Sequence, residues 1–190
     1  MDQFGAALVD LVLESERLIL RTPRPGDALP MAALANDRRV AEGTLNMPFP
    51  YDAHDAETFI ELARTARERS SFLANAIERK SDGAFIGMIG LVFQMEYDRA
   101  ELGYWLGVPF WNQGYATEAA RALLDFAFRE LRLNRVYAAH YGDNPASGRV
   151  MQKLGMTYEG TLRQHLIRLG RPKDNVCYGI LRDEWLANPY

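Results

Sequence analysis

Cysteine is almost absent from this chain, whose 190 residues include a single thiol, Cys177. One cysteine cannot close a disulfide within the chain, and with only three histidines the sequence argues against a zinc module. We therefore expect the cytosol as the compartment and no metal at the functional site. An excess of basic residues is also missing, because 22 Lys and Arg stand against 25 Asp and Glu. The net charge of −3 disfavours a protein that binds nucleic acid directly.

Long hydrophobic runs are missing as well. Asp10 interrupts the apolar run over residues 6–13, and no Lys or Arg precedes that run, so we expect no signal peptide. No segment reaches the roughly 20 apolar residues that span a bilayer, so a membrane partner is not expected. Repeats and Gly/Ser linkers are absent too. We expect an N-terminal extension over residues 1–16, with an amphipathic helix or strand, and a single domain over residues 17–190.

What the chain does have is a regular succession of strand and helix patterns. Apolar residues predict strands over residues 17–22, 72–78, 85–93, 100–106, 135–141, 157–164 and 176–181. Short turns between the second, third and fourth of these predict an antiparallel meander. The strand–helix–strand unit at residues 101–140 predicts one parallel pair. The fold class is therefore α+β, or mixed α/β, with one central, mostly antiparallel sheet flanked by helices.

Four helices are predicted from caps and from a period of 3.6 residues. Asp27 caps the first helix. A second helix begins near Asp55, with its arginines, Arg67 among them, mostly facing solvent. The third follows Gly114. Asn144, with a proline after it, is a strong N-cap for the fourth helix.

The most informative stretch is Trp111–Asn–Gln–Gly–Tyr–Ala116, where a strand runs into a glycine-containing turn that opens an Ala-rich helix. The free N–H groups of such a turn converge, and the helix dipole adds partial positive charge, so the turn can hold a pyrophosphate. Gly114 lets the backbone approach closely. The stretch is neither a Walker A loop nor a GxGxxG fingerprint. Taken alone, an ordinary tight connection is the alternative interpretation.

The surrounding residues resemble the GNAT superfamily of N-acetyltransferases. Residues 111–116 resemble its acyl-CoA motif, Q/R-x-x-G-x-G/A. ELGYWL, GYATEAA, NPAS and KLGM, in this order, and the closing GRPKD…YGILRDEW resemble the RimJ/RimL group of ribosomal-protein N-acetyltransferases over about residues 17–186. The resemblance implies a GNAT-like sheet with one splayed parallel pair, and acetyl-CoA as co-substrate.

Three positions depart from the family pattern. Trp111 stands where the family has Gln or Arg, and Asn112 stands where this group often has Gly. Both are compatible with phosphate binding by main-chain N–H groups. Met151 stands where many GNAT enzymes carry a Tyr that protonates the leaving thiolate, so that role is not carried over to this position.

The turn and the resemblance together predict the cofactor-binding residues. Backbone groups freed where the strand ends, at residues 106–108, would bind pantetheine amides and polarise the thioester carbonyl. Asn144 would contact the cofactor arm as well as cap its helix. Arg149 and Lys153 are candidates to bind the CoA phosphates, and the alternative interpretation is that they are ordinary charged residues on a helix surface. The full set is Leu106, Gly107, Val108, Asn112, Gln113, Gly114, Tyr115, Ala116, Thr117, Asn144, Ser147, Arg149 and Lys153.

Two residues are candidates for proton transfer. The family is understood to act by direct attack of the amine in a ternary complex, without an acyl-enzyme. The amine must then lose a proton, and the thiolate should leave protonated. Glu101 is the candidate base, directly or through water, with a solvated strand glutamate as the alternative interpretation. Ser147 is the candidate proton donor, with a first-turn surface serine as its alternative. Cys177 has no motif around it and is interpreted as a packed strand residue.

The acceptor is predicted less sharply. Phe49, Tyr51, Tyr178 and Glu101 are candidate substrate-binding residues, and the loop over residues 46–51 is expected to hold the acceptor, although packed aromatics are the alternative. The resemblance favours a protein or peptide N-terminal α-amine, such as that of a ribosomal protein. A polyamine or aminoglycoside, and a non-catalytic acyl-CoA sensor, remain alternatives. Acidic residues, Asp52 and Asp55 included, suggest a cationic acceptor. The oligomeric state stays open, with a homodimer as one option.

Overall fold

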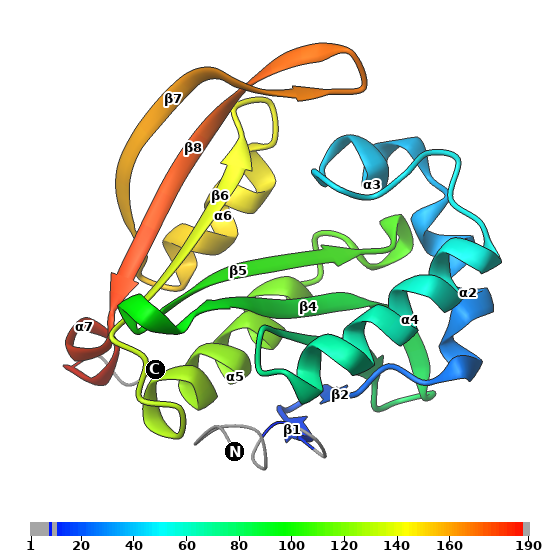
Figure 1. Cartoon of the computed structure of the whole chain (residues 1–190), viewed down its shortest axis with the longest axis horizontal. Helices are drawn as coiled ribbons and strands as arrows, with labels where there is room; N and C mark the ends of the chain where they lie inside the picture. The colour runs from blue at the N-terminus through cyan, green and yellow to red at the C-terminus, as the bar shows by residue number, and fades with distance from the viewer. Residues whose placement is uncertain (1–7, 9–10, 188–190) are drawn as a thin grey trace.

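The computed structural model describes Leu8 and residues 11–187, which form one sheet with helices on both faces (Figure 1). The strands are β1 (Leu13–Glu14), β2 (Leu18–Arg21), β3 (Phe72–Arg79), β4 (Ala84–Gln94), β5 (Arg99–Leu106), β6 (Arg135–Tyr141), β7 (Thr157–Arg168) and β8 (Arg171–Leu181). The helices are α2 (Ala28–Ala35), α3 (Arg38–Glu42), α4 (Ala53–Glu68), α5 (Tyr115–Arg129), α6 (Pro145–Lys153) and α7 (Arg182–Ala187).

The strands follow the order β1-β2-β3-β4-β5-β6-β8-β7, and every neighbouring pair is antiparallel except β5 and β6. This confirms the predicted fold class and the predicted parallel pair. The β5–β6 ladder has only three rungs and ends at Glu101 and Tyr137. Beyond that rung, β5 continues beside β4 while β6 continues beside β8, so the two strands diverge (Figure 1).

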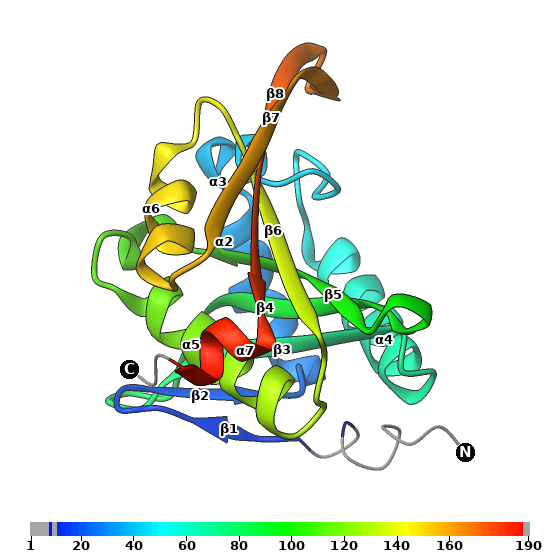
Figure 2. The ribbon, with the colours of Figure 1, turned by 90° about the vertical axis from the view of Figure 1, so that its left-hand side faces the viewer.

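The helices pack against the sheet through apolar faces. On one face of the sheet, α5 and α6 bury the larger core, to which α5 contributes a helical stripe that includes Ala119, Ala120, Leu123 and Leu124. On the other face, α2 and α4 bury a smaller core against β3 and β4. Figure 2 shows α5 and α6 on one side of the sheet and α4 on the other.

Two predictions about charged residues were wrong. Arg67 of α4 is only 2% exposed, and its guanidinium donates to the Leu8 and Ala74 carbonyls and to the Asn75 side chain. Periodicity alone could not place it, because its hydrogen-bond partners come from other parts of the chain. Asp27 makes no side-chain cap to α2. Its carboxylate instead accepts two hydrogen bonds from Arg21, at 2.7 and 2.8 Å.

The last two strands extend further than predicted and form a long hairpin. Arg168, at the end of β7, is buried, and its guanidinium donates to the carbonyls of Ala41 and Met47. Ala41 belongs to α3, and Met47 to the loop before α4. Figure 1 shows the hairpin rising beside β6 and curving over toward α3. One arginine therefore ties the β7–β8 hairpin to the opposite side of the molecule.

The predicted N-terminal extension lies mostly outside the described residues. Its described part includes the buried Leu8 and the short strand β1, which pairs with β2. Among the described residues, no helix is both long enough and apolar enough to cross a membrane.

Replacing Asp27 with Asn should destabilise the fold. The Arg21–Asp27 ion pair is buried, with side chains 9% and 8% exposed, and loss of one partner from a buried pair costs about 3 kcal/mol. Burial would raise the pKa of Asp27, but hydrogen bonds from Arg21 and from the Arg24 N–H outweigh it and lower that pKa. The pair therefore stabilises the protein above the ordinary Asp pKa of about 4, and this contribution is lost as the pH falls further.

Denaturant unfolding at pH 7 and at pH 3 measures this effect. The gap in unfolding free energy between the parent and Asp27→Asn should be large at pH 7 and should shrink at pH 3. Glu68→Gln, which breaks an exposed pair with Arg64, is the control and should change stability little at either pH. Equal losses for both variants at pH 7 would contradict the assignment.

Candidate functional site

A cleft of about 490 Å³ opens where β5 and β6 diverge. Its walls come from the end of β5, the turn before α5, the N-terminus of α6 and, across from these, α3. The predicted residues that line the cleft are Leu106, Asn112, Gly114, Tyr115, Ala116, Thr117, Asn144, Ser147, Arg149 and Lys153. Sequence patterns from separate parts of the chain thus meet in one cavity.

The turn before α5 presents unpaired N–H groups to this cleft. Asn112 and Gly114 adopt positive φ angles of 59° and 83°, which turn the chain sharply into the helix. No carbonyl of the described residues accepts from the backbone N–H groups of residues 114–117, which open the helix. Unpaired donors at a helix N-terminus favour an anion, so the turn is suited to a phosphate.

The side chains of the turn hold its shape. The Trp111 indole N–H donates to the Leu106 carbonyl at 2.8 Å, and the Gln113 amide donates to the Pro109 carbonyl at 2.8 Å. The Gln113 side chain therefore holds the loop together, and Gln113 is not among the residues that line the cleft. Trp111 occupies the Gln/Arg position of the motif as a brace for the turn.

Most backbone groups at residues 106–108 have partners, although we expected them to be free. The Gly107 N–H donates to the Ile86 carbonyl of β4 at 2.9 Å, the Leu106 carbonyl accepts from the Trp111 indole, and the Val108 carbonyl accepts from the Trp111 N–H. Gly107 and Val108 do not line the cleft.

The free strand edge lies earlier, from the Leu102 carbonyl to Tyr104. Successive residues of a strand direct their N–H and C=O groups to opposite edges. Gly107 bonds to β4, so the groups of Trp105 and Gly103 face β4 too, while those of Leu102 and Tyr104 face β6. The last rung, at Glu101 and Tyr137, uses the Leu102 N–H, and no rung reaches the Leu102 carbonyl or Tyr104. These backbone groups are suited to the amides of an extended ligand.

The N-terminus of α6 forms the second wall. Asn144 is the predicted N-cap, and its Oδ1 accepts from the Ser147 N–H while its Nδ2 donates to Ser147 Oγ at 3.1 Å. Tyr104 donates its hydroxyl to the Ser147 carbonyl at 3.3 Å, and burial raises the pKa of Tyr104 to about 12. The Ser147 hydroxyl is thus held in the cleft beside a tyrosine that stays protonated. Met151, below it, is buried in the core.

Glu101 lies on the last rung of the β5–β6 ladder and does not line the cleft. Its side chain projects from the face opposite α5, as alternation along β5 requires, because Ala100 and Leu102 enter the core. The side chain keeps contact with solvent, yet desolvation by the surrounding walls raises the pKa of its carboxyl. The Tyr137 hydroxyl donates to Glu101 at 3.5 Å and partly offsets this effect.

The predicted acceptor residues do not reach the cleft. Tyr51 is 6% exposed and packs in the smaller core against Met31, and Tyr178 is 7% exposed and bonds to Gln152 of α6. Phe49 is partly exposed, but no residue of the 46–51 loop lines the cleft. The aromatic residues were better interpreted as packing.

The acidic residues expected near the acceptor have another role. Asp52 and Asp55 form a reciprocal capping box at the start of α4, where each carboxylate accepts from the other residue's N–H at 3.0 Å. Neither lines the cleft. They therefore offer no support for a cationic acceptor.

Sequence reasoning missed the wall that faces the turn. The five-residue helix α3 contributes Arg39, Val40 and Glu42 to the cleft, and Asp143 and Lys173, an ion pair, contribute from the other side. A signal for α3 was present, because Asp37 caps the helix by accepting from the Arg39 N–H. Its shortness left no apolar period to detect.

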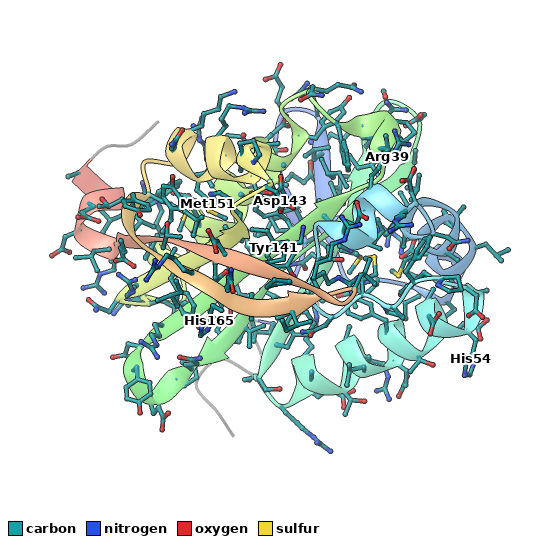
Figure 3. All side chains as sticks on the ribbon, turned by 90° about the horizontal axis from the view of Figure 1, so that it is seen from above. Arg39, His54, Tyr141, Asp143, Met151 and His165 are labelled. Carbon is teal, nitrogen blue, oxygen red and sulfur yellow. The ribbon has the colours of Figure 1, made fainter. Side chains whose placement is uncertain are left out.

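The described residues contain no cluster of three or more His, Cys, Asp or Glu side chains that could hold a metal ion. Figure 3 shows His54 and His165 on separate parts of the molecule, with Tyr141 and Asp143 near the middle of the view. Burial, followed by the charges of Glu159 and Glu101, raises the pKa of the Cys177 thiol, so this group favours its protonated form.

Comparison with known proteins gives a consistent result. Residues 17–157 match the family model of the acetyltransferase (GNAT) domain. YoaA of Bacillus subtilis, named as an N-acetyltransferase, is 31% identical over 90% of this chain and 97% of its own. YdaF of the same organism, named as a ribosomal N-acetyltransferase, is 33% identical over 90% and 94%. The crystal structure of a GNAT-family acetyltransferase from Bacillus anthracis, 25% identical, superposes with a TM-score of 0.82 over 92% of this chain and 100% of that one.

Two tyrosines near the cleft should respond oppositely to removal of the hydroxyl. Tyr141 is 5% exposed, and its hydroxyl has no hydrogen-bond partner among the described residues, whereas the Tyr104 hydroxyl has one. Tyr141→Phe should leave the unfolding free energy unchanged or raise it by up to about 1 kcal/mol, and Tyr104→Phe should lower it by about 1 kcal/mol. Denaturant unfolding measures both free energies, and a clear loss of unfolding free energy in Tyr141→Phe would contradict this prediction.

Proposed function

The chain belongs to the GNAT family of acetyltransferases, and on that premise we propose that it transfers the acetyl group of acetyl-CoA to an N-terminal α-amine of a protein or peptide. The observation that carries this proposal is the divergence of β5 from β6. It places a donor cleft on one face of the sheet and a desolvated carboxylate, Glu101, on the other, at the closed end of the gap.

The residues of the cleft fit acetyl-CoA, which supplies an activated acetyl thioester when bound. The unpaired N–H groups of residues 114–117 suit its diphosphate. The free backbone edge from the Leu102 carbonyl to Tyr104 suits the amides of its pantetheine arm. Arg149 and Lys153 line the same cleft and add positive charge for its phosphates.

Glu101 acts as the base in this proposal. An α-amine reacts only in its neutral form, so a carboxylate or a water held by it must take the proton. A raised pKa makes Glu101 a stronger base than an ordinary glutamate. The carboxylate forms no ion pair with the described residues, and its hydrogen-bond partner is the Tyr137 hydroxyl at a long 3.5 Å.

Ser147 supplies a proton to the departing thiolate in this proposal. Its Oγ accepts from Asn144 Nδ2, which leaves its own hydroxyl hydrogen available for donation into the cleft. Because Met151 has no hydrogen to donate, Ser147 is the polar side chain of α6 suited to this task. Tyr104 keeps the first turn of α6 in place through the Ser147 carbonyl.

The acceptor class is inferred from the relatives. YdaF is named as a ribosomal N-acetyltransferase, which favours a protein N-terminus.

The amine acceptor can be tested directly by measuring thiol release from acetyl-CoA. Peptides with a free N-terminus should be turned over, and the same peptides with a blocked N-terminus should not, even where they contain lysine. Spermidine and an aminoglycoside form the comparison set. Higher kcat/KM with either of these than with every free peptide would replace the proposed acceptor, and no turnover with any amine would refute an acetyltransferase of amines.

Glu101→Gln should remove the base and lower kcat by about 100-fold, while the affinity for acetyl-CoA stays nearly unchanged. In the parent, kcat/KM should fall on the acid side with an apparent pKa above the ordinary glutamate value, because protonation inactivates the base. That acid limb should be missing from the variant. A parent-like limb in Glu101→Gln would show that another group is the base.

A further inference from the structure

Arg17, which precedes β2, contacts the turn before α5 from outside the cleft. Arg17 Nη1 donates to the Gln113 carbonyl at 3.1 Å, and the guanidinium lies over the Tyr115 ring, 4.5 Å from its centroid. Arg17 itself does not line the cleft. Its contacts are to the outer side of the turn, where a ligand of the cleft would not touch it.

Glu118 of α5 holds Arg17 in this position. Its carboxylate accepts from Arg17 Nε and from the Arg17 backbone N–H, both at 2.7 Å, and lies 2.6 Å from Arg17 Nη2. Ser15 Oγ donates to the same carboxylate at 2.7 Å. Glu118 is only 16% exposed, and its multiple partners fix the guanidinium in one orientation. This arrangement is more constrained than an ordinary surface ion pair.

The contact with Gln113 determines where the next N–H points. In a trans peptide, the carbonyl of one residue and the N–H of the next point in opposite directions. The one cis peptide among the described residues lies elsewhere, at Phe49–Pro50. With the Gln113 carbonyl turned outward to Arg17, the Gly114 N–H must point inward. Gly114, at a φ of 83°, lines the cleft.

We propose that Arg17, oriented by Glu118, is a positioning residue that fixes the Gln113–Gly114 peptide so that the turn directs its N–H groups at the diphosphate of acetyl-CoA. A glycine with a free choice of φ could otherwise rotate this peptide and turn a carbonyl toward the anion. Arg17 prevents that rotation by holding the carbonyl. Its positive charge is matched by Glu118, so its effect is exerted through backbone geometry.

The test compares CoA with pantetheine, which lacks the whole phosphoadenosine diphosphate part of CoA. Binding of CoA, and of pantetheine, which lacks the diphosphate, can be followed by the fluorescence of Trp105 and Trp111, which both line the cleft. Arg17→Ala should raise the Kd of CoA about 10-fold, the loss of roughly one charge-assisted hydrogen bond. The Kd of pantetheine should not change. Neither measurement needs an acceptor, so the result is independent of the acceptor proposed above.

Two further variants keep the test decisive. Glu118→Gln keeps Arg17 but weakens the ion pair that orients its guanidinium. This variant should raise the Kd of CoA less than Arg17→Ala does. Arg17→Lys, which cannot reach Gln113 and Glu118 together in the same way, should fall between the parent and Arg17→Ala. If Arg17→Ala does not fold, the CoA affinities of these two variants still test the proposal.

Lys80→Ala is the matched control. The Lys80 side chain bonds to Glu14 and to the Ser15 carbonyl near Arg17, and among the described residues it has no hydrogen bond to the turn. This variant should leave the affinities for CoA and pantetheine unchanged. If Arg17→Ala and Glu118→Gln lower the thermal stability but leave the CoA affinity intact, or if they weaken CoA and pantetheine equally, Arg17 is only a structural residue and the proposal is overturned.

Discussion

The three-rung ladder between β5 and β6 is the constraint from which the site follows. Parallel pairing holds the strands together as far as Glu101 and Tyr137, and beyond that rung each strand keeps only its outer neighbour. The inner edge of β5 is left with backbone groups that need partners, and burial without partners would be costly. Because α5 and α6 both begin at the open end of the gap, their N-termini supply further unpaired donors there. A wedge lined by such donors is suited to a long anion with amide groups.

The same divergence separates the chemical roles by face. Side chains alternate along β5, so Leu102 and Tyr104 face α5 and α6, whereas Glu101 faces away from them. A donor that lies along the inner edge and an amine that arrives from the Glu101 face would meet in the gap. The cleft therefore needs no carboxylate among its own walls near the thioester, and Glu101 can be desolvated without facing the phosphates.

Much of the fold was predictable because its signals are local. The apolar runs of β3 and β4, the alternation in β5, the stripe on α5, and the Asn144 cap each depend on residues within one element. The cleft was predictable in part for the same reason, since its phosphate turn is a contiguous motif. The predictions that failed concerned residues whose positions depend on partners far away in the sequence. The destination of Arg67, the buried packing of Tyr51 and Tyr178, and the internal bonds at Gly107 are decided by neighbours that the local pattern does not contain.

The opposite end of the cleft depends on one arginine in a similar way. Arg168 is buried and has no carboxylate partner among the described residues, and its guanidinium donates to the Ala41 and Met47 carbonyls. Ala41 lies in the last turn of α3, where the helix dipole is negative, so the site suits a cation. Arg168 belongs to the β7–β8 hairpin, so this contact ties the hairpin to a helix that lines the cleft. Arg17 at the phosphate end and Arg168 at the other therefore serve the same physical purpose: each holds backbone carbonyls in place, and the geometry of the cleft between them follows.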